Sequence, residues 1–149
     1  MTREAIHAEE FTPFGLWVKE KLRDSRRAKN GRAAGLCVTN LDYVFESFKP
    51  IAATHARRCI MLVEEKQNGA SLQTGQQLTF HLLDKALRIA MPQLNYDYWG
   101  FYLLSFSGLG TSPSDDAAMS LNGNRITEQE LIDHLDFYKR FCEPMVFSE

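Results

Sequence analysis

The sequence predicts a mixed α/β domain, in which helices flank a small sheet. Apolar runs rich in β-favouring residues alternate with segments of helical spacing, in the order helix, two or three strands, helix, strand, helix. The chain has 149 residues, of which 44% are hydrophobic and 24% are charged, as in an ordinary globular protein. We therefore expect one domain over residues 1–149, with a core at about 12–107 and a C-terminal hairpin and helix at 119–142.

The first predicted element is a helix that begins at Thr12-Pro13, an N-cap followed by proline at the first helical position. Phe14 and Trp17 start an apolar stripe at helical spacing, and Asn30-Gly31 is a suitable end. The same stretch is strongly basic, which indicates either a solvated helix face or a surface that contacts phosphates. Its cations are Lys19, Lys21, Arg23, Arg26, Arg27, Lys29 and Arg32.

Strands are predicted at three places. Residues 33–48 are rich in β-favouring side chains and read as one bent strand or two short ones, with a break near Thr39-Asn40. Residues 59–66 contain the apolar run Ile60–Val63, which ends abruptly in three charges, and this strand is expected to pair antiparallel with the preceding one. Residues 98–107 form a strong strand, expected to be central or to lie against a helix.

A second helix is predicted over residues 73–90 and is closed by Pro92. Its expected apolar side consists of Leu78, Leu82, Leu83, Ala86, Leu87 and Ile89. Asn122-Gly123 predicts a tight hairpin turn, and the capping box Thr127–Glu130 opens a last helix. The expected core side of that last helix consists of Leu131, Ile132, Leu135 and Phe137 or Tyr138.

Composition limits the classes of function. The net charge of −2 is uneven, because residues 1–91 carry 14 Lys/Arg against 10 Asp/Glu and residues 92–149 carry 3 against 9, so a polyanion would meet the first part. No apolar run is long enough to span a membrane, and the first ten residues do not resemble a signal peptide. The His and Cys spacings do not predict zinc binding, and we expect reduced thiols in a cytoplasmic protein. The cysteines are Cys37, Cys59 and Cys142.

Acidic and basic side chains gather at the end of the strand 59–66. Because side chains alternate along a strand, Glu64 and Lys66 are expected on one face and Glu65 on the other. Asp42 precedes Glu64 by 22 residues, a spacing at which a hairpin could bring the two carboxylates together. Two carboxylates and a backbone carbonyl, for which we expect that of Glu65, suit Mg²⁺ or Mn²⁺. The added lysine favours hydrolysis of a phosphodiester. The alternative interpretation of these charges is a solvated strand end without a catalytic role.

Asp42 with Glu64-Glu65-Lys66 resembles the D…(D/E)xK signature of the PD-(D/E)XK nuclease superfamily. The resemblance covers residues 12–107 and implies a restriction-endonuclease-like core: a helix, a three-stranded meander, a helix and another strand. It implies that Asp42 and Glu64 bind metal and that Lys66 is catalytic. Many members carry Gln-x-x-x-Tyr on the following helix, and here Gln76 is followed by Phe80, without the hydroxyl. Many members also carry a glutamate on the first helix, facing the metals, for which Glu20 is the candidate.

The favoured function is therefore that of an Mg²⁺- or Mn²⁺-dependent deoxyribonuclease. Gln76 or Gln77 would orient Lys66 or a phosphate, and a homodimer or a protein partner is expected because the chain has little net positive charge. One alternative is a catalytically silent protein of the same fold that binds nucleic acid or a partner. Another is an adaptor or inhibitor that works through its acidic C-terminal part. The expected DNA contacts are Lys19, Arg23, Arg26, Arg27, Lys29, Arg57 and Arg58.

Overall fold

The computed structural model describes residues 12–18, 40–47, 58–108, 113 and 118–147. The chain divides into two compact units, residues 1–38 and 39–149. In the first unit, helix α2 (Pro13–Val18) begins where the Thr12-Pro13 signal predicted it. Its Phe14 and Trp17 rings stack with centroids 6.0 Å apart. The predicted end of this helix and its basic cluster lie outside the described residues.

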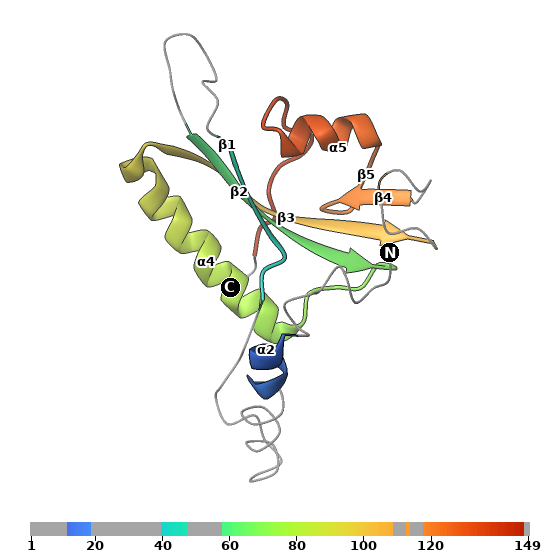
Figure 1. Cartoon of the computed structure of the whole chain (residues 1–149). Coiled ribbons are helices and arrows are strands. Elements are labelled where there is room, and N and C mark those ends of the chain that lie inside the picture. Colours follow the sequence, from blue (N-terminus) through green and yellow to red (C-terminus); the bar gives the residue numbers. More distant parts are fainter. Residues whose placement is uncertain (1–11, 19–39, 48–57, 109–112, 114–117, 148–149) are drawn as a thin grey trace. The chain divides into compact units, whose positions relative to one another are not determined.

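The second unit is built on a mixed sheet, which confirms the predicted α/β class (Figure 1). Its described strands follow the chain order from one edge to the other. The first two strands are antiparallel, as predicted; β2 and β3 are parallel; β4 and β5 continue antiparallel from β3. The strands are β1 (Tyr43–Ser47), β2 (Arg58–Gln67), β3 (Tyr96–Ser107), β4 (Ala118–Leu121) and β5 (Asn124–Ile126).

Helix α4 (Thr74–Ala90) is the crossover that two parallel strands require, and it matches the predicted helix within a residue (Figure 1). Its N-terminus carries a capping box, in which the side chains of Gln73 and Gln76 bond to each other's backbone N–H groups. The helix passes directly into a 3₁₀ turn, η3 (Met91–Leu94), at Pro92. Asn95 then reverses the chain with a φ of 63° and leads into β3.

Both faces of the central strands are buried, which explains the continuous apolar run in β2. On one face, Leu62 and Phe101 form a cluster with Leu72 and with Phe80 of α4. On the other face, a larger cluster packs other apolar β2 and β3 side chains against the C-terminal elements. Its buried members include Cys59, Met61, Val63, Tyr102, Leu104, Phe106, Leu121, Leu131 and Phe137.

The predicted apolar side of α4 is wrong. Phe80 and Asp84 are the buried residues of the helix, and Leu87 packs beside them. Most of the predicted side instead faces solvent, because the sheet-facing stripe is defined by one large aromatic ring rather than by the number of leucines. The exposed fractions are 69% for Leu78, 70% for Leu82, 38% for Leu83 and 63% for Ile89.

The C-terminal elements follow the sequence signals closely. Asn122-Gly123 forms the tight turn between β4 and β5. Helix α5 (Glu128–Leu135) opens with the predicted capping box, in which Thr127 Oγ1 accepts from the N–H of Glu130. Leu131, Leu135 and Phe137 pack into the core as expected. Two of the expected core residues are exposed instead, Ile132 at 49% and Tyr138 at 80%.

The last residues close an edge of the sheet. Strand β4 pairs with β3 only from Leu104 onwards. On the N-terminal side of Leu104, the side-chain amide of Asn122 links β3 to the C-terminal segment. Its Oδ1 accepts from the N–H of Leu103 (2.8 Å), and its Nδ2 donates to the carbonyl of Glu143 (2.9 Å). The N–H of Met145 then donates to the carbonyl of Phe101 at 2.8 Å. Segment 143–147 is therefore held beside β3 by one backbone hydrogen bond, and Met145 and Phe147 pack on the α4 side.

Among the described residues, no helix is long and apolar enough to cross a membrane. Cys59 is buried, as predicted, and Cys142 is half-buried.

Candidate active site

Asp42, one residue before β1, lies opposite Glu64 of the neighbouring strand β2. Tyr43 pairs with Val63 at the start of β1, so one further step along the antiparallel ladder brings Asp42 opposite Glu64. Directly opposite residues of such a pair carry their side chains on the same face. The Asp42 carboxylate is also tied to β2, because its Oδ2 accepts a hydrogen bond from the N–H of Glu65 at 2.9 Å. The structure thus brings these two predicted ligands together.

Glu64 is a buried carboxylate, with only 3% of its surface exposed. It lies two residues after Leu62, whose side chain packs with α4, so alternation places Glu64 on the same face of the sheet. A carboxylate removed from water is stable only with hydrogen-bond donors or a cation beside it. The burial of this side chain is therefore consistent with a role as a ligand to a cation.

Lys66 lies on the same face as Glu64 and is held in place by α4. Its Nζ donates a hydrogen bond to Oε1 of Gln76 at 3.0 Å. The same Oε1 accepts from the N–H of Gln73 at 3.1 Å, as part of the capping box. One amide oxygen therefore joins the end of β2 to the N-terminus of α4 and holds the ammonium on the face of the sheet that carries Glu64.

The two other helix residues singled out in the sequence do not reach Lys66. The Gln77 amide turns away from it and donates to the carbonyl of Leu72 at 3.1 Å. Phe80, at the position of the aromatic residue in the Gln-x-x-x-Tyr pattern, is 1% exposed. Its ring centroid lies 4.7 Å from that of Phe101, so this ring belongs to the core.

Several predicted site residues lie elsewhere or outside the described chain. Arg58 begins β2, six residues before Glu64, which separates the two by about 20 Å along the strand. Arg58 is therefore remote from the candidate site. The residues outside the described chain are Lys19, Glu20, Arg23, Arg26, Arg27, Lys29 and Arg57.

Within the described part of the chain, no three His, Cys, Asp or Glu side chains come together in a way that could hold a metal. A cation at this site would therefore have Asp42 and Glu64 as its side-chain ligands there, completed by a backbone carbonyl and water. That donor set fits Mg²⁺, which takes oxygen ligands and keeps several of its waters.

A second polar cluster, which the sequence analysis did not predict, lies at the other end of α4. Asp84, 6% exposed, accepts hydrogen bonds from the hydroxyl of Tyr98 (2.7 Å) and from Nε of Arg88 (3.0 Å). Burial, together with the Asp84 carboxylate, raises the pKa of the Tyr98 hydroxyl above its usual range. The i, i+4 spacing of Asp84 and Arg88 was the one visible signal. The cluster lies about 12 Å along the helix from Gln76.

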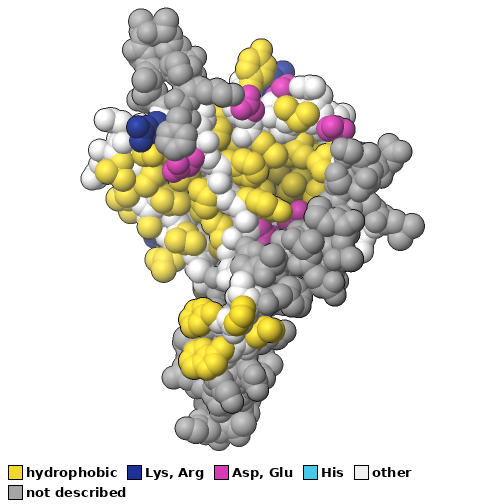
Figure 2. Space-filling model, viewed as in Figure 1, with side chains coloured by type: hydrophobic (Ala, Val, Ile, Leu, Met, Phe, Trp, Pro, Cys, Tyr) yellow, Lys and Arg dark blue, Asp and Glu magenta, His cyan; other side chains and the backbone are white. Residues whose placement is uncertain are grey.

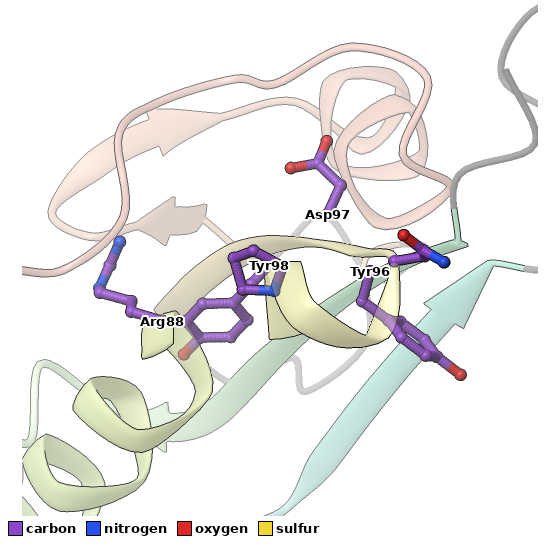
Figure 3. Close-up of a pocket in the computed structure, with 6 residues that line it drawn as sticks. Arg88, Tyr96, Asp97 and Tyr98 are labelled. Atoms are coloured by element: carbon purple, nitrogen blue, oxygen red, sulfur yellow. The ribbon is translucent and has the colours of Figure 1, made fainter. Parts of the chain in front are cut away.

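A shallow hollow borders this cluster, lined by η3 and the start of β3 (Figure 3). Figure 3 shows Arg88 beside Tyr98, whereas Tyr96 and Asp97 point in opposite directions from β3. The polar groups do not converge on a common point, so the cluster has the character of a structural anchor between α4 and β3.

In comparisons with protein-family models, with curated proteins and with solved structures, nothing matches this chain. Membership of the PD-(D/E)XK superfamily stays a prediction, which rests on the residues at the end of β2.

Proposed function

We propose that this chain is a metal-dependent nuclease that hydrolyses DNA phosphodiester bonds. The observation that supports this most directly is the meeting of Asp42, Glu64 and Lys66 on one face of the sheet, with Lys66 bonded to Gln76. An acidic pair and a fixed ammonium within one small site provide opposite charges for a cation and for a phosphoryl group.

The order of elements adds support to the PD-(D/E)XK assignment. That family implies a strand meander, a helix and a further strand, and β1, β2, α4 and β3 follow in that order. The restriction-endonuclease-like fold is part of the proposal, because the first predicted strand of the meander lies outside the described residues.

In this proposal, Asp42 and Glu64 hold the cation. When bound, Mg²⁺ would offset negative charge on a phosphoryl oxygen and lower the pKa of a water molecule. Lys66 places its ammonium against the scissile phosphate, where it stabilises the charge that develops as water attacks phosphorus and the P–O ester bond breaks. Gln76 is a positioning residue, because it keeps the ammonium at one place.

The N-terminus of α4 lies beside this site through Gln73 and Gln76. The first N–H groups of a helix carry partial positive charge and attract phosphates. The predicted DNA contacts in the basic stretch 19–32 would add the sequence-independent part of the affinity, which falls steeply with salt.

The test is cleavage of linear, nicked, single-stranded and branched DNA with Mg²⁺ or Mn²⁺. We expect Lys66→Ala and Asp42→Asn each to reduce the rate by about 1,000-fold or more. Asp42→Asn keeps an oxygen that can accept from the N–H of Glu65, so it removes the charge with little loss of structure. Lys139→Ala, at an exposed lysine of the C-terminal part, is the matched control and should keep full activity.

Metal binding can be measured apart from activity, by calorimetric titration of Mn²⁺. Binding that disappears in Asp42→Asn but persists in Lys66→Ala is expected. Cleavage that survives both substitutions would place the activity elsewhere. Wild-type protein that binds DNA without cleaving it would favour the catalytically silent alternative, and absence of DNA binding at low salt would leave the adaptor or inhibitor.

A further inference from the structure

The last described stretch of the chain, residues 139–147, has no helix or strand of its own and lies beside β3. We call it the C-terminal strap. It follows Phe137, which has a φ of 60° and a ring centroid 5.0 Å from that of Trp99. Near the other end of the strap, the N–H of Met145 donates to the carbonyl of Phe101. A segment without regular structure that is held by few hydrogen bonds can open without unfolding of the domain.

The beginning of the strap is bonded to a buried imidazole. His134 of α5 is 0% exposed, and its Nδ1 accepts a hydrogen bond from the N–H of Phe141 at 3.0 Å. A ring nitrogen that accepts carries no hydrogen, so the hydrogen of the neutral imidazole is on Nε2. Among the described residues, Nε2 has no hydrogen-bond partner. The imidazole instead makes T-shaped contacts with the rings of Tyr102 and Trp99, at centroid distances of 4.4 and 5.5 Å.

This arrangement favours the neutral imidazole. An added proton would be on Nδ1, directly opposite the N–H of Phe141, so two donors would face each other. The new charge would also be buried, with no acceptor for Nε2 in the described part of the chain. Both penalties disappear when Phe141 moves away and water reaches Nδ1. Uptake of a proton by His134 and departure of Phe141 are therefore coupled.

The charged groups around His134 also favour the neutral form. Burial and, to a smaller extent, Arg140 of the strap lower the pKa of His134 to about 4. The Arg140 guanidinium lies 4.9 Å from the centroid of the Trp99 ring. Tyr102 stays neutral, because burial raises its pKa to about 12. The other titratable groups on these elements do not reverse the effect of Arg140. They are Asp97 of β3, Lys139, Cys142 and Glu143 of the strap, and Glu128, Glu130, Asp133 and Asp136 of α5 and its cap.

We propose that the C-terminal strap leaves the edge of β3 when His134 takes up a proton. Phe137 stays packed on Trp99, so α5 keeps its place on the sheet while the strap departs. The proposal goes beyond the cleavage of DNA and holds whether or not the chain is a nuclease, because it depends on the contacts of the strap alone.

Release of the strap changes the surface beside β3. It breaks the hydrogen bond from Met145 to Phe101 and widens the hollow that the strap forms with Leu103 and Asn122. It also uncovers Met145 and Phe147 on the α4 side, where Figure 2 shows other hydrophobic side chains at the surface. The released form therefore presents a free stretch of β3 edge and a larger apolar surface.

The test is amide hydrogen exchange of the full chain from pH 7 to pH 4, followed by NMR and corrected for the intrinsic exchange rate at each pH. The N–H groups of Phe141 and Met145 report opening of the strap. The N–H of Val63, in the inner strand β2, reports unfolding of the whole domain. Phe141 and Met145 should be protected about tenfold less than Val63, or less still, at every pH.

The size of the pH response follows from the change in the pKa of His134. A pKa that rises from about 4 to its ordinary value of 6.5 on release corresponds to an increase of about 100-fold in the opening equilibrium between pH 7 and pH 4. Incomplete exposure of the ring to water would reduce this increase. We therefore expect the opening of the strap to increase by about tenfold to 100-fold.

His134→Asn is the decisive variant, because the asparagine oxygen can accept from the N–H of Phe141 and takes up no proton. The protection of its strap should not depend on pH. His81→Asn is the matched control: His81 of α4 stacks on Phe147 with centroids 5.7 Å apart and is the other described histidine. This control should keep the pH response of the wild type.

A second variant keeps the role of His134 testable if His134→Asn does not fold. Asn122→Ala removes the hydrogen bond to the carbonyl of Glu143 and weakens the attachment of the strap. Because the coupling is reciprocal, this substitution should raise the pKa of His134 measured by NMR. An unchanged pKa would contradict the coupling.

The exchange data can overturn the proposal in three ways. Equal protection of Phe141, Met145 and Val63 at every pH would mean that the strap opens only when the whole domain unfolds. Protection of the strap that stays constant from pH 7 to pH 4 would rule out a response to the proton. A pH response that His134→Asn retains, or that His81→Asn abolishes, would assign the response to another group.

Discussion

Gly100→Ala should be far more damaging than alanine at an otherwise similar glycine. Gly100 has a φ of 107°, and a Cβ there would overlap Cβ of Pro144 and lie 3.2 Å from Nη2 of Arg88. Gly108 has a φ of 91° and nothing within 4 Å of the added atom. The two substitutions thus share the backbone strain, and only the first also displaces segment 143–147.

The size of the difference follows from what that segment contributes. Positive φ costs an alanine about 1–2 kcal/mol at either position. Displacing Pro144 also breaks the hydrogen bond from Met145 to Phe101, worth about 1 kcal/mol. It partly exposes Met145 and Phe147, which costs about 1–2 kcal/mol more. The free energy of unfolding should fall by about 3–5 kcal/mol for Gly100→Ala and by about 1–2 kcal/mol for Gly108→Ala.

Urea unfolding followed by the fluorescence of Trp99, beside Gly100, measures both values. Pro144→Gly removes the atom that the new Cβ would meet, so it should cost less in the Gly100→Ala background than in the wild type. Equal losses from the two glycine substitutions would refute the close approach of segment 143–147 to β3. Additive effects of Gly100→Ala and Pro144→Gly would refute it as well.

Three further outcomes are expected. Burial, with a smaller effect of Arg140, lowers the pKa of His134 to about 4. The neutral imidazole therefore makes its full contribution to the free energy of unfolding above pH 6.5, and about 3 kcal/mol of that free energy is lost as the pH falls to 4. Urea unfolding from pH 4 to 8 should show that slope, and His134→Asn should flatten it. Tyr98→Phe removes the hydrogen bond to buried Asp84 and should lower the free energy of unfolding by about 1–3 kcal/mol, against no change for Tyr138→Phe. Asn122→Ala removes two bonds to the backbone and should cost about 2–3 kcal/mol, with segment 143–147 becoming sensitive to protease at low enzyme concentration.

The turns and helix starts were predictable because their signals are local. Thr127 and Glu130 lie three residues apart, and Asn122 and Gly123 are neighbours, so a short stretch of sequence is enough to specify the helix cap and the turn. The approach of Asp42 to Glu64 was predictable only as one possibility, because the spacing of 22 residues permits a hairpin but does not determine its register.

The buried side of α4 was not predictable, because it depends on contacts distant in sequence. Asp84 is stable in the interior only with the hydroxyl of Tyr98, which lies on another element. Helical periodicity alone ranks an aspartate as a surface residue and Leu82 as a core residue. In the structure, Asp84 is buried and Leu82 is exposed, because Asp84 makes one long-range hydrogen bond and the ring of Phe80 occupies the core.

The bond from Gln76 to Lys66 was foreseen only as one of two possibilities. Gln76 and Gln77 are the same residue type, and their side chains leave the helix in directions that differ by about 100°. Only the docking of α4 against β2 determines which amide reaches the ammonium. The closing segment at Met145 gave no sequence signal, because a single hydrogen bond and two apolar contacts leave no periodic pattern.

The Asn122-Gly123 turn is also a site at which the chain can be altered chemically. Asparagine is a thermolabile residue, and its side-chain amide can be lost when the N–H of a following glycine attacks the side-chain carbonyl to form a cyclic imide. The product, an aspartate or its β-linked isomer, has no Nδ2 to donate to the carbonyl of Glu143. Loss of the amide at Asn122 would therefore remove one of the bonds that hold segment 143–147 beside β3, and would leave the hydrogen bond from Met145 to Phe101 in place.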